Sequence, residues 1–289
     1  MSRLSDSYQI FKNSLGVIRR NLKLCWFILI VGILQVALLG IWVAITGLPM
    51  AGSGAAVHDW RGWLGVFGWL ACTGFAGIFC NVAMYSEIFN ALNGRGVSVR
   101  RGFSLALSRL PQIVAWSVFA ATVGTIMRMF EERLGVLGRF ILRGIGIVWA
   151  VATLFVVPVI AREKNGINPL NYLRRSAAVL SAKWGESIVG FVGITILSGI
   201  VIFMVVALAL ACIAVMVWGT ISGSPETDWM ACWLPVVMAV LFVVIGVVIT
   251  QLPMMVYIGS LYIYATEGVI PEGFSQRDMD SAWKIKVSK

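Results

Sequence analysis

Long stretches without a charged residue dominate this chain and limit the folds it can adopt. A membrane-spanning helix needs about 20 apolar residues, and within lipid it must be helical so that its backbone hydrogen bonds are satisfied internally. The sequence therefore predicts an all-α polytopic membrane protein, with a single transmembrane domain over residues 1–289 and a polar C-terminal tail at 267–289. Six spans are predicted, at residues 24–46, 63–86, 110–127, 144–161, 187–218 and 230–260.

Composition supports the membrane class and bears on its partners. Only 12% of the residues are charged and 59% are hydrophobic, whereas soluble domains carry about 25% charged residues. The net charge of +10 would suggest nucleic acid in a soluble protein. Here the basic residues gather at the ends of apolar runs, so anionic lipid headgroups are the expected partners and nucleic acid is not.

Lysine and arginine are distributed unevenly between the predicted connections. Six spans place both termini on one side, and that side carries 18 basic residues against five on the other. Cytoplasmic segments of membrane proteins are enriched in Lys and Arg. Both termini are therefore expected to be cytoplasmic, with anionic headgroups against that face.

The segment RMFEERLGVLGRFILRG, residues 128–144, carries most of the basic residues predicted on the outer side. Gly135 and Gly138 predict a tight hairpin between the third and fourth spans. Its charges either form ion pairs across the two arms, glutamates 131 and 132 with arginines 139 and 143, or make a contact for a ligand, lipid or partner. The candidate contact residues are Arg128, Glu131, Glu132, Arg133, Arg139 and Arg143.

Few polar residues lie within the predicted spans, and none at their centres is charged. Glu87 lies at the cytoplasmic end of the second span, while Asn81 and Gln251 are uncharged candidates for hydrogen bonds between helices or for lining a cavity. Pro158 and Pro253 lie toward the cytoplasmic ends of the fourth and sixth spans, where proline kinks a helix. Kinks at corresponding places in repeats can mark a substrate site; adjustment of packing is the alternative.

Short amphipathic segments lead into the outward-going spans. SLGVIRRNLKLCW at 14–26 and SLALSRLPQIVAW at 104–116 share four identities without gaps, and SAAVLSAKWGESI at 176–188 is a looser third copy. Such segments lie along the headgroup boundary with their basic face toward phosphates. The sequence thus predicts three repeats, each an interfacial helix followed by a helical hairpin.

Signatures of catalysis and of metal or cofactor binding are missing from the sequence. His58 is the only histidine, and none of the five cysteines lies in a CxxC pair, so no zinc site is predicted. There is no GxSxG, Walker or HExxH motif. We therefore expect no enzyme activity, no cofactor and no metal.

Four segments resemble an uncharacterised bacterial family of six-helix membrane proteins, catalogued as a domain of unknown function. They are EERLGVLG at 131–138, VWAVATLFVVPVIA at 148–161, RRSAAVLSAKWGE at 174–186 and LYIYATEGVIPEGF at 261–274. The layout of amphipathic helix and span is more distantly similar to membrane domains of glycerophosphodiester phosphodiesterases. The resemblance implies a multi-pass protein of the bacterial inner membrane and transfers no active residues.

Three functions remain open from the sequence. The first is a non-enzymatic inner-membrane protein that binds lipid or a membrane-protein partner. The alternative is a channel or facilitator for a small solute, with residues 128–144 at its external mouth. An enzyme acting on lipid is the least favoured. Absent charge at the span centres favours the first function over transport.

Overall fold

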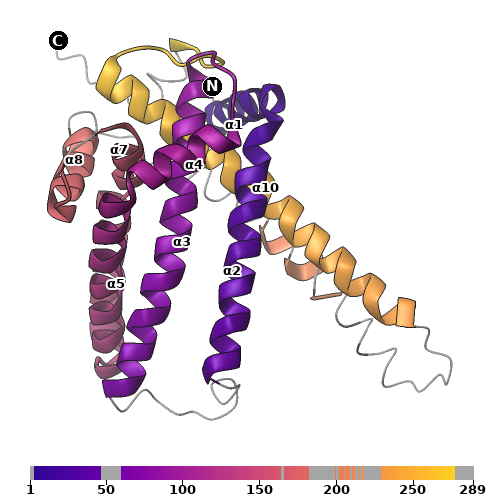
Figure 1. The fold of residues 1–289 in the computed structure, drawn as a ribbon, viewed down its shortest axis with the longest axis vertical. Coiled ribbons are helices and arrows are strands. Elements are labelled where there is room, and N and C mark those ends of the chain that lie inside the picture. Colours follow the sequence, from indigo (N-terminus) through magenta and orange to yellow (C-terminus); the bar gives the residue numbers. More distant parts are fainter. Residues whose placement is uncertain are drawn as a thin grey trace.

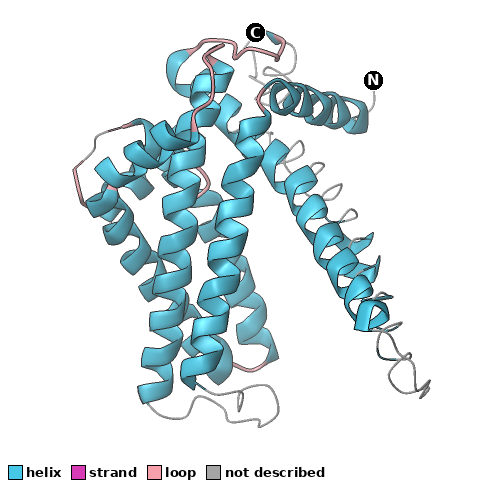
Figure 2. Cartoon of the chain, turned by 45° about the vertical axis from the view of Figure 1, so that its right-hand side comes forward, coloured by secondary structure: helices cyan, strands magenta, loops and turns pink. Residues whose placement is uncertain are grey.

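The computed structural model describes residues 3–46, 60–163, 166–181 and 229–276, together with scattered positions between 199 and 217. Within them the regular elements are helices and no strand occurs, which confirms the all-α prediction (Figure 2). The helices are α1 (Arg3–Arg20), α2 (Cys25–Thr46), α3 (Trp60–Leu92), α4 (Val99–Ser108), α5 (Leu110–Arg133), α6 (Val136–Ala152), α7 (Val156–Arg162), α8 (Pro169–Ser181) and α10 (Trp229–Glu267), with a short 3-10 turn η1 (Leu22–Leu24).

Five helical stretches are long and apolar enough to cross a membrane, as expected of a multi-pass membrane protein. They are Leu22–Trp42, Trp63–Leu92, Leu110–Arg133, Gly138–Arg162 and Val244–Glu267. They correspond to the predicted first, second, third, fourth and sixth spans. The predicted fifth span, 187–218, lies largely outside the described residues, so the count of six stays a prediction.

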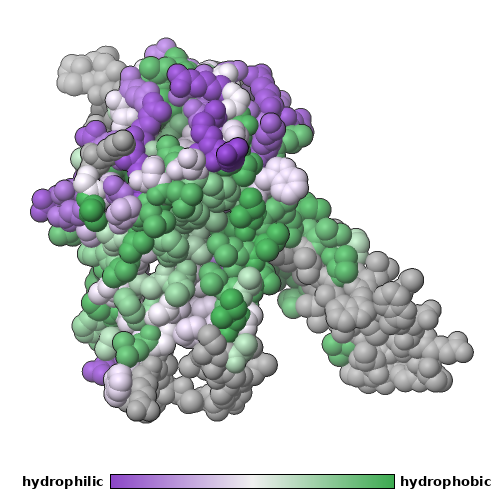
Figure 3. Space-filling model, viewed as in Figure 1, coloured by the Kyte–Doolittle hydropathy of each residue, from purple (hydrophilic) through white to green (hydrophobic). Residues whose placement is uncertain are grey.

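The helices give the molecule two distinct ends (Figure 1). At one end lie α1, α4, α8 and the segment after α10; this is called the basic end below. The α5–α6 turn lies at the other, called the hairpin end. Hydrophilic residues gather over the basic end, while the sides of the bundle are hydrophobic (Figure 3). This division is what two membrane surfaces and a lipid-facing belt between them require.

The tightly packed core lies toward the basic end. Phe89 of α3 and Phe155, next to α7, both contact the ring of Tyr262 of α10, with centroid separations of 5.7 and 6.1 Å. Gly259 of α10 permits this approach, because a Cβ there would lie 3.0 Å from Ile88. Toward the hairpin end, large apolar side chains of α2 and α6 are exposed instead. Lipid is the expected neighbour of those side chains.

Two of the predicted amphipathic segments are surface helices that break before a span. The chain leaves α1 at Asn21 and passes through η1 into α2, and it leaves α4 at Arg109 and enters α5. Pro111 lies in the first turn of α5, where its missing N–H costs no intrahelical bond. α8 is the third surface helix; the rest of segment 176–188 lies outside the described residues.

The two prolines predicted to kink spans behave differently. The fourth span is interrupted at 153–155, and Pro158 lies in the first turn of α7 that follows. The backbone N–H of Phe155 within this break donates to Ser176 Oγ of α8 at 3.1 Å, so the break is satisfied by a neighbouring helix. α10 runs without interruption through Pro253, and equivalent breaks in the two spans are therefore not found.

α10 is longer than a bilayer is thick. Its 39 residues extend about 58 Å at the rise of an α-helix, against a hydrocarbon core of about 30 Å. Its C-terminal part packs against α1, α2 and α3, while its N-terminal part diverges from α2 and α3 (Figures 1 and 2). The helix thus joins the bundle mainly at the basic end.

Candidate functional site at the basic end

The segment 128–144 folds as the predicted tight hairpin. α5 ends at Arg133 and α6 begins at Val136, so only two residues make the turn. Gly138 is required for it, because a Cβ there would lie 2.7 Å from the Cβ of Leu134. The hairpin geometry was therefore predictable from the two glycines.

The predicted ion pairs across this hairpin do not form. All six candidate residues are exposed, and the four ion pairs in the described part of the chain lie elsewhere. Arg139 instead donates from Nε to the carbonyl of Leu134 at 3.1 Å. An exposed pair gains only about 0–1 kcal/mol, which is too little to fix the arms in register. The segment remains an exposed charged turn and a candidate contact surface.

Glu87 is the best-satisfied acid in the described structure. Its side chain is fully buried, and it accepts two hydrogen bonds from Arg101 of α4, Nε to Oε1 at 2.8 Å and Nη2 to Oε2 at 2.6 Å. The backbone N–H of Ser98 and the amide of Asn90 donate to the same carboxylate at 2.7 and 3.1 Å. Hydrogen bonding to Glu87 raises the pKa of Arg101 above its usual value. Glu87 thus fastens α4 to the end of α3.

A second polar cluster joins α7, α8 and α10. Glu163 accepts hydrogen bonds from the hydroxyl of Tyr262 at 2.6 Å and from Arg175 Nε at 3.1 Å. Arg162 donates to Glu267 from Nε at 3.0 Å, and its guanidinium lies over the ring of Phe89 at 5.6 Å. These contacts tie the ends of three helices together, and each acid in them has a partner.

The ion pairs leave an excess of unpaired positive charge at the basic end. The fourth pair joins Arg20 to Glu272 at 3.2 Å, so each of the four glutamates described at this end is paired. Seven described basic side chains there form no ion pair with any described residue. They are Lys12, Arg19, Lys23, Arg95, Arg100, Arg109 and Arg174.

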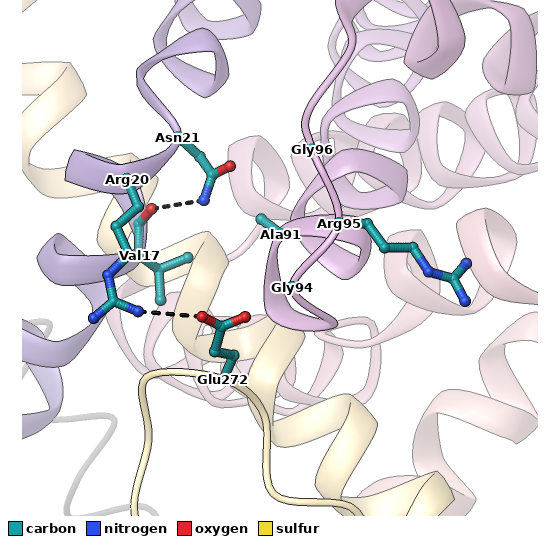
Figure 4. A pocket seen from close by; sticks show the side chains of 8 residues that line it. All are labelled: Val17, Arg20, Asn21, Ala91, Gly94, Arg95, Gly96 and Glu272. Atoms are coloured by element: carbon teal, nitrogen blue, oxygen red, sulfur yellow. Dashed lines mark hydrogen bonds and ion pairs between the residues drawn. The ribbon is translucent and has the colours of Figure 1, made fainter.

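A pocket opens between α1, the end of α3 and the segment after α10 (Figure 4). The turn at 93–96 forms one wall, with Gly94 at φ +70, a backbone conformation that residues with a Cβ rarely adopt. Glu272 lies against this turn: a Cβ on Gly94 would be 2.7 Å from its Oε2, its N–H donates to the carbonyl of Leu92 at 2.9 Å, and its carboxylate pairs with Arg20. Asn21 donates to the carbonyl of Val17 at 3.1 Å. The pocket holds about 210 Å³.

A second hollow of about 470 Å³ adjoins the first along α1 and is also lined by basic residues, among them Lys12, Arg19 and Arg20. Neither lining contains a histidine, cysteine or serine that could act as a nucleophile or base. No group of three metal-ligating side chains occurs among the described residues. The basic side chains that line both hollows can bind an anionic group.

The two uncharged polar residues predicted to link spans, Asn81 and Gln251, form no hydrogen bond between described helices. No hydrogen bond joins the side chain of Asn81 or Gln251 to any described residue, and Gln251 is exposed. Gln35 makes the interhelical bond instead, donating from Nε2 of α2 to the carbonyl of Thr73 of α3 at 3.0 Å. One sign of this role was visible in the sequence: Gln35 is a polar residue within the first apolar run.

Sequence reasoning also missed the partners of the buried groups. Arg101 and Tyr262 lie in helices other than that of the acid they bind, so spacing along the sequence gave no sign of them. The buried phenol of Tyr172 was missed as well; burial raises its pKa above the usual value, while the nearby charge of Arg109 acts in the opposite direction.

Residues 62–272 match DUF6159, a family of unknown function. The chain belongs to this family. The match spans more than two thirds of the sequence and includes the hairpin, the Glu87 cluster and the Glu163 cluster. No curated protein and no solved structure matches the chain. The expected membership of a family of unknown function is thus confirmed, and the more distant likeness to phosphodiesterase membrane domains stays a prediction.

Proposed function

We propose that this member of the DUF6159 family is a non-enzymatic inner-membrane protein whose basic end, on the cytoplasmic side, binds anionic phospholipid headgroups. The observation that carries the proposal is the charge balance at that end. All four glutamates described at that end are paired, and seven described basic side chains there lack a carboxylate partner. A surface of this kind attracts anionic lipid with about 1 kcal/mol per basic residue.

The position of the surface helices supports this function. α1, α4 and α8 lie at the level where the spans end (Figure 1), and helices at that level place their basic side chains among headgroup phosphates. Exposed arginines stand on each of them, Arg19 on α1, Arg100 on α4 and Arg174 on α8. Headgroups on several sides of the bundle could therefore be contacted at once.

The test compares two sets of three exposed arginines. R19Q/R95Q/R174Q removes unpaired charge from the basic end, and R128Q/R133Q/R143Q removes the same amount from the hairpin end. Detergent-purified protein is titrated with phosphatidylglycerol or phosphatidylcholine, and bound lipid is counted by native mass spectrometry. The first set should lose phosphatidylglycerol affinity by more than tenfold, with about 3 kcal/mol as the upper limit.

The second set is the control, because it leaves the basic end intact. It should change phosphatidylglycerol affinity by less than threefold, and neither set should change binding of zwitterionic phosphatidylcholine much. Equal losses in the two sets, or no preference of the unmodified protein for phosphatidylglycerol, would contradict the proposal.

A further inference from the structure

Arg109, at the junction of α4 and α5, is a buried cation with no ion-pair partner among the described residues. It is 6% exposed, its Nε has no hydrogen-bond acceptor, and it takes part in no ion pair with a described residue. Arg101 and Arg162, by contrast, each donate twice to a glutamate. A buried guanidinium without an acceptor destabilises a fold, so an acceptor from outside the chain is expected.

A second unpaired group lies one turn further along α5. The Oε1 atom of Gln112 is buried and has no donor among the described residues. Residues three apart on a helix share a face, so Arg109 and Gln112 offer a donor and an acceptor next to each other. Arg109 is the C-cap of α4 as well as the N-cap of α5, so its side chain leaves the backbone at the junction of the two helices.

The surroundings place this site at the boundary between lipid and headgroups. Arg109 immediately precedes the span Leu110–Arg133. Apolar side chains around it on the chain are exposed, 61% for Leu107 and 43% for Val114. α8 packs against α5, and the charge of Arg109 acts on the phenol of Tyr172 in α8. The guanidinium thus lies between exposed apolar surface and a second surface helix.

We propose that Arg109, together with the first turn of α5, binds a phosphate group, with the phosphodiester of a membrane phospholipid as the source that the exposed apolar neighbours favour. Arginine suits this role because its planar fork matches phosphate oxygens and because it stays charged when buried. Gln112 Oε1 then accepts from a headgroup hydroxyl or ammonium. The inference rests on the proposed lipid-binding function and adds one specific site to a diffuse basic surface.

The test uses the delipidated full chain at about 0.5 M NaCl, where screening weakens exposed charges far more than buried ones. Thermal unfolding is followed after addition of phosphatidylglycerol, phosphatidylcholine, phosphate-free diacylglycerol or inorganic phosphate. The unmodified protein and R143Q, which removes an exposed charge at the hairpin end, should gain several degrees with both phospholipids and nothing with diacylglycerol. R109M should lose this gain, because methionine fills a similar volume without a charge.

Thermal unfolding without lipid should show the opposite effect of the R109M substitution on stability. R109M should then be at least as stable as the unmodified protein, because it removes an unpaired buried charge. Lower stability of lipid-free R109M would overturn the proposal, since it would mean that Arg109 has a partner within the chain, Gln112 included. A phospholipid gain kept in full by R109M would also overturn it. A gain with inorganic phosphate equal to that with phospholipid would support the site and assign it to the free anion.

The two proposals fail in different ways in these experiments. If the phosphatidylglycerol preference at low salt is absent but the Arg109-dependent gain at high salt remains, the basic surface fails and the site stands. If the preference is present and R109M behaves like R143Q, the surface stands and the site is overturned.

Discussion

Gly102 sets how closely α4 can approach α3. A Cβ at this position would lie 2.8 Å from the carbonyl oxygen of Ala83 and 2.9 Å from the ring of Phe27. That close approach is what brings Arg101, the preceding residue, within reach of the buried carboxylate of Glu87. One glycine without a side chain therefore decides whether the ion pair can form.

The substitution G102A should destabilise the protein by about 1–3 kcal/mol, the usual cost of overpacking. G74A is the matched control, since Gly74 also lies in a helix and a Cβ there would meet nothing within 4 Å. It should be neutral or stabilise by about 0.5–1 kcal/mol through backbone entropy. Thermal unfolding in detergent measures both variants, and similar changes in the two would show that α4 does not pack on α3 in this way.

The Glu87–Arg101 pair should show strong coupling in a double-mutant cycle. R101Q leaves a buried carboxylate with fewer donors. E87Q removes the negative charge and replaces one of the two acceptor oxygens of Arg101, which is 51% exposed, by an NH2 group. Because half of the arginine is solvated, we expect a coupling free energy of about 1–2 kcal/mol, below that of a fully buried pair. The double variant should be more stable than the sum of the single changes predicts; additive losses would contradict the bidentate contact.

For single residues, the sequence identified the buried acid but not the residue that pairs with it. Glu87 was singled out because it is an acid at the end of an apolar run, and it proved to be buried. Arg101 is 14 positions away on another helix, and only the folded chain brings it near. Conversely, the exposed hairpin glutamates have arginines close by in sequence and still form no ion pair with a described residue, because an exposed pair gains little free energy.

At the scale of elements, the breaks between helices determine how the surface helices and spans are joined at the basic end. The α6–α7 break exposes backbone groups in a buried place, and Ser176 of α8 satisfies one of them by accepting from the N–H of Phe155. Pro158 and the glycines of the hairpin signalled a kink and a turn in the sequence, because proline and glycine act directly on the local backbone. The long uninterrupted α10 was harder to foresee, since proline within a helix is tolerated when neighbours pack around it.

S176A should destabilise the protein by about 1–3 kcal/mol, because it leaves a buried N–H without an acceptor. S104A is the matched control. Ser104 lies at the equivalent place in the second amphipathic segment but is exposed, so its loss should cost less than about 0.5 kcal/mol. Unfolding midpoints of the two variants give the comparison, and a harmless S176A would show that the break has another acceptor.

At the scale of the whole molecule, the two ends differ in how their charges are used. At the basic end, ion pairs hold surface helices to the spans, and further arginines have no ion-pair partner among the described residues. At the hairpin end, exposed charges lie on α5 and α6, on both sides of a two-residue turn. Charge counting along the sequence predicted this polarity, because loops at the same end share a membrane surface. It could not predict where the core lies, since that depends on which apolar faces meet.

The orientation of this polarity is open to a direct labelling experiment. Gly96 and Gly135 are exposed turn residues at opposite ends, and a Cβ at either would meet nothing within 4 Å. In a background without native cysteines, an impermeant maleimide added to intact spheroplasts should label G135C and should reach G96C only after the membrane is opened. The reverse pattern would place the basic end outside and remove the cytoplasmic lipid surface from the proposed function. Labelling of both residues from one side would contradict the α5 span itself, because Leu110–Arg133 is the one crossing that separates the two positions.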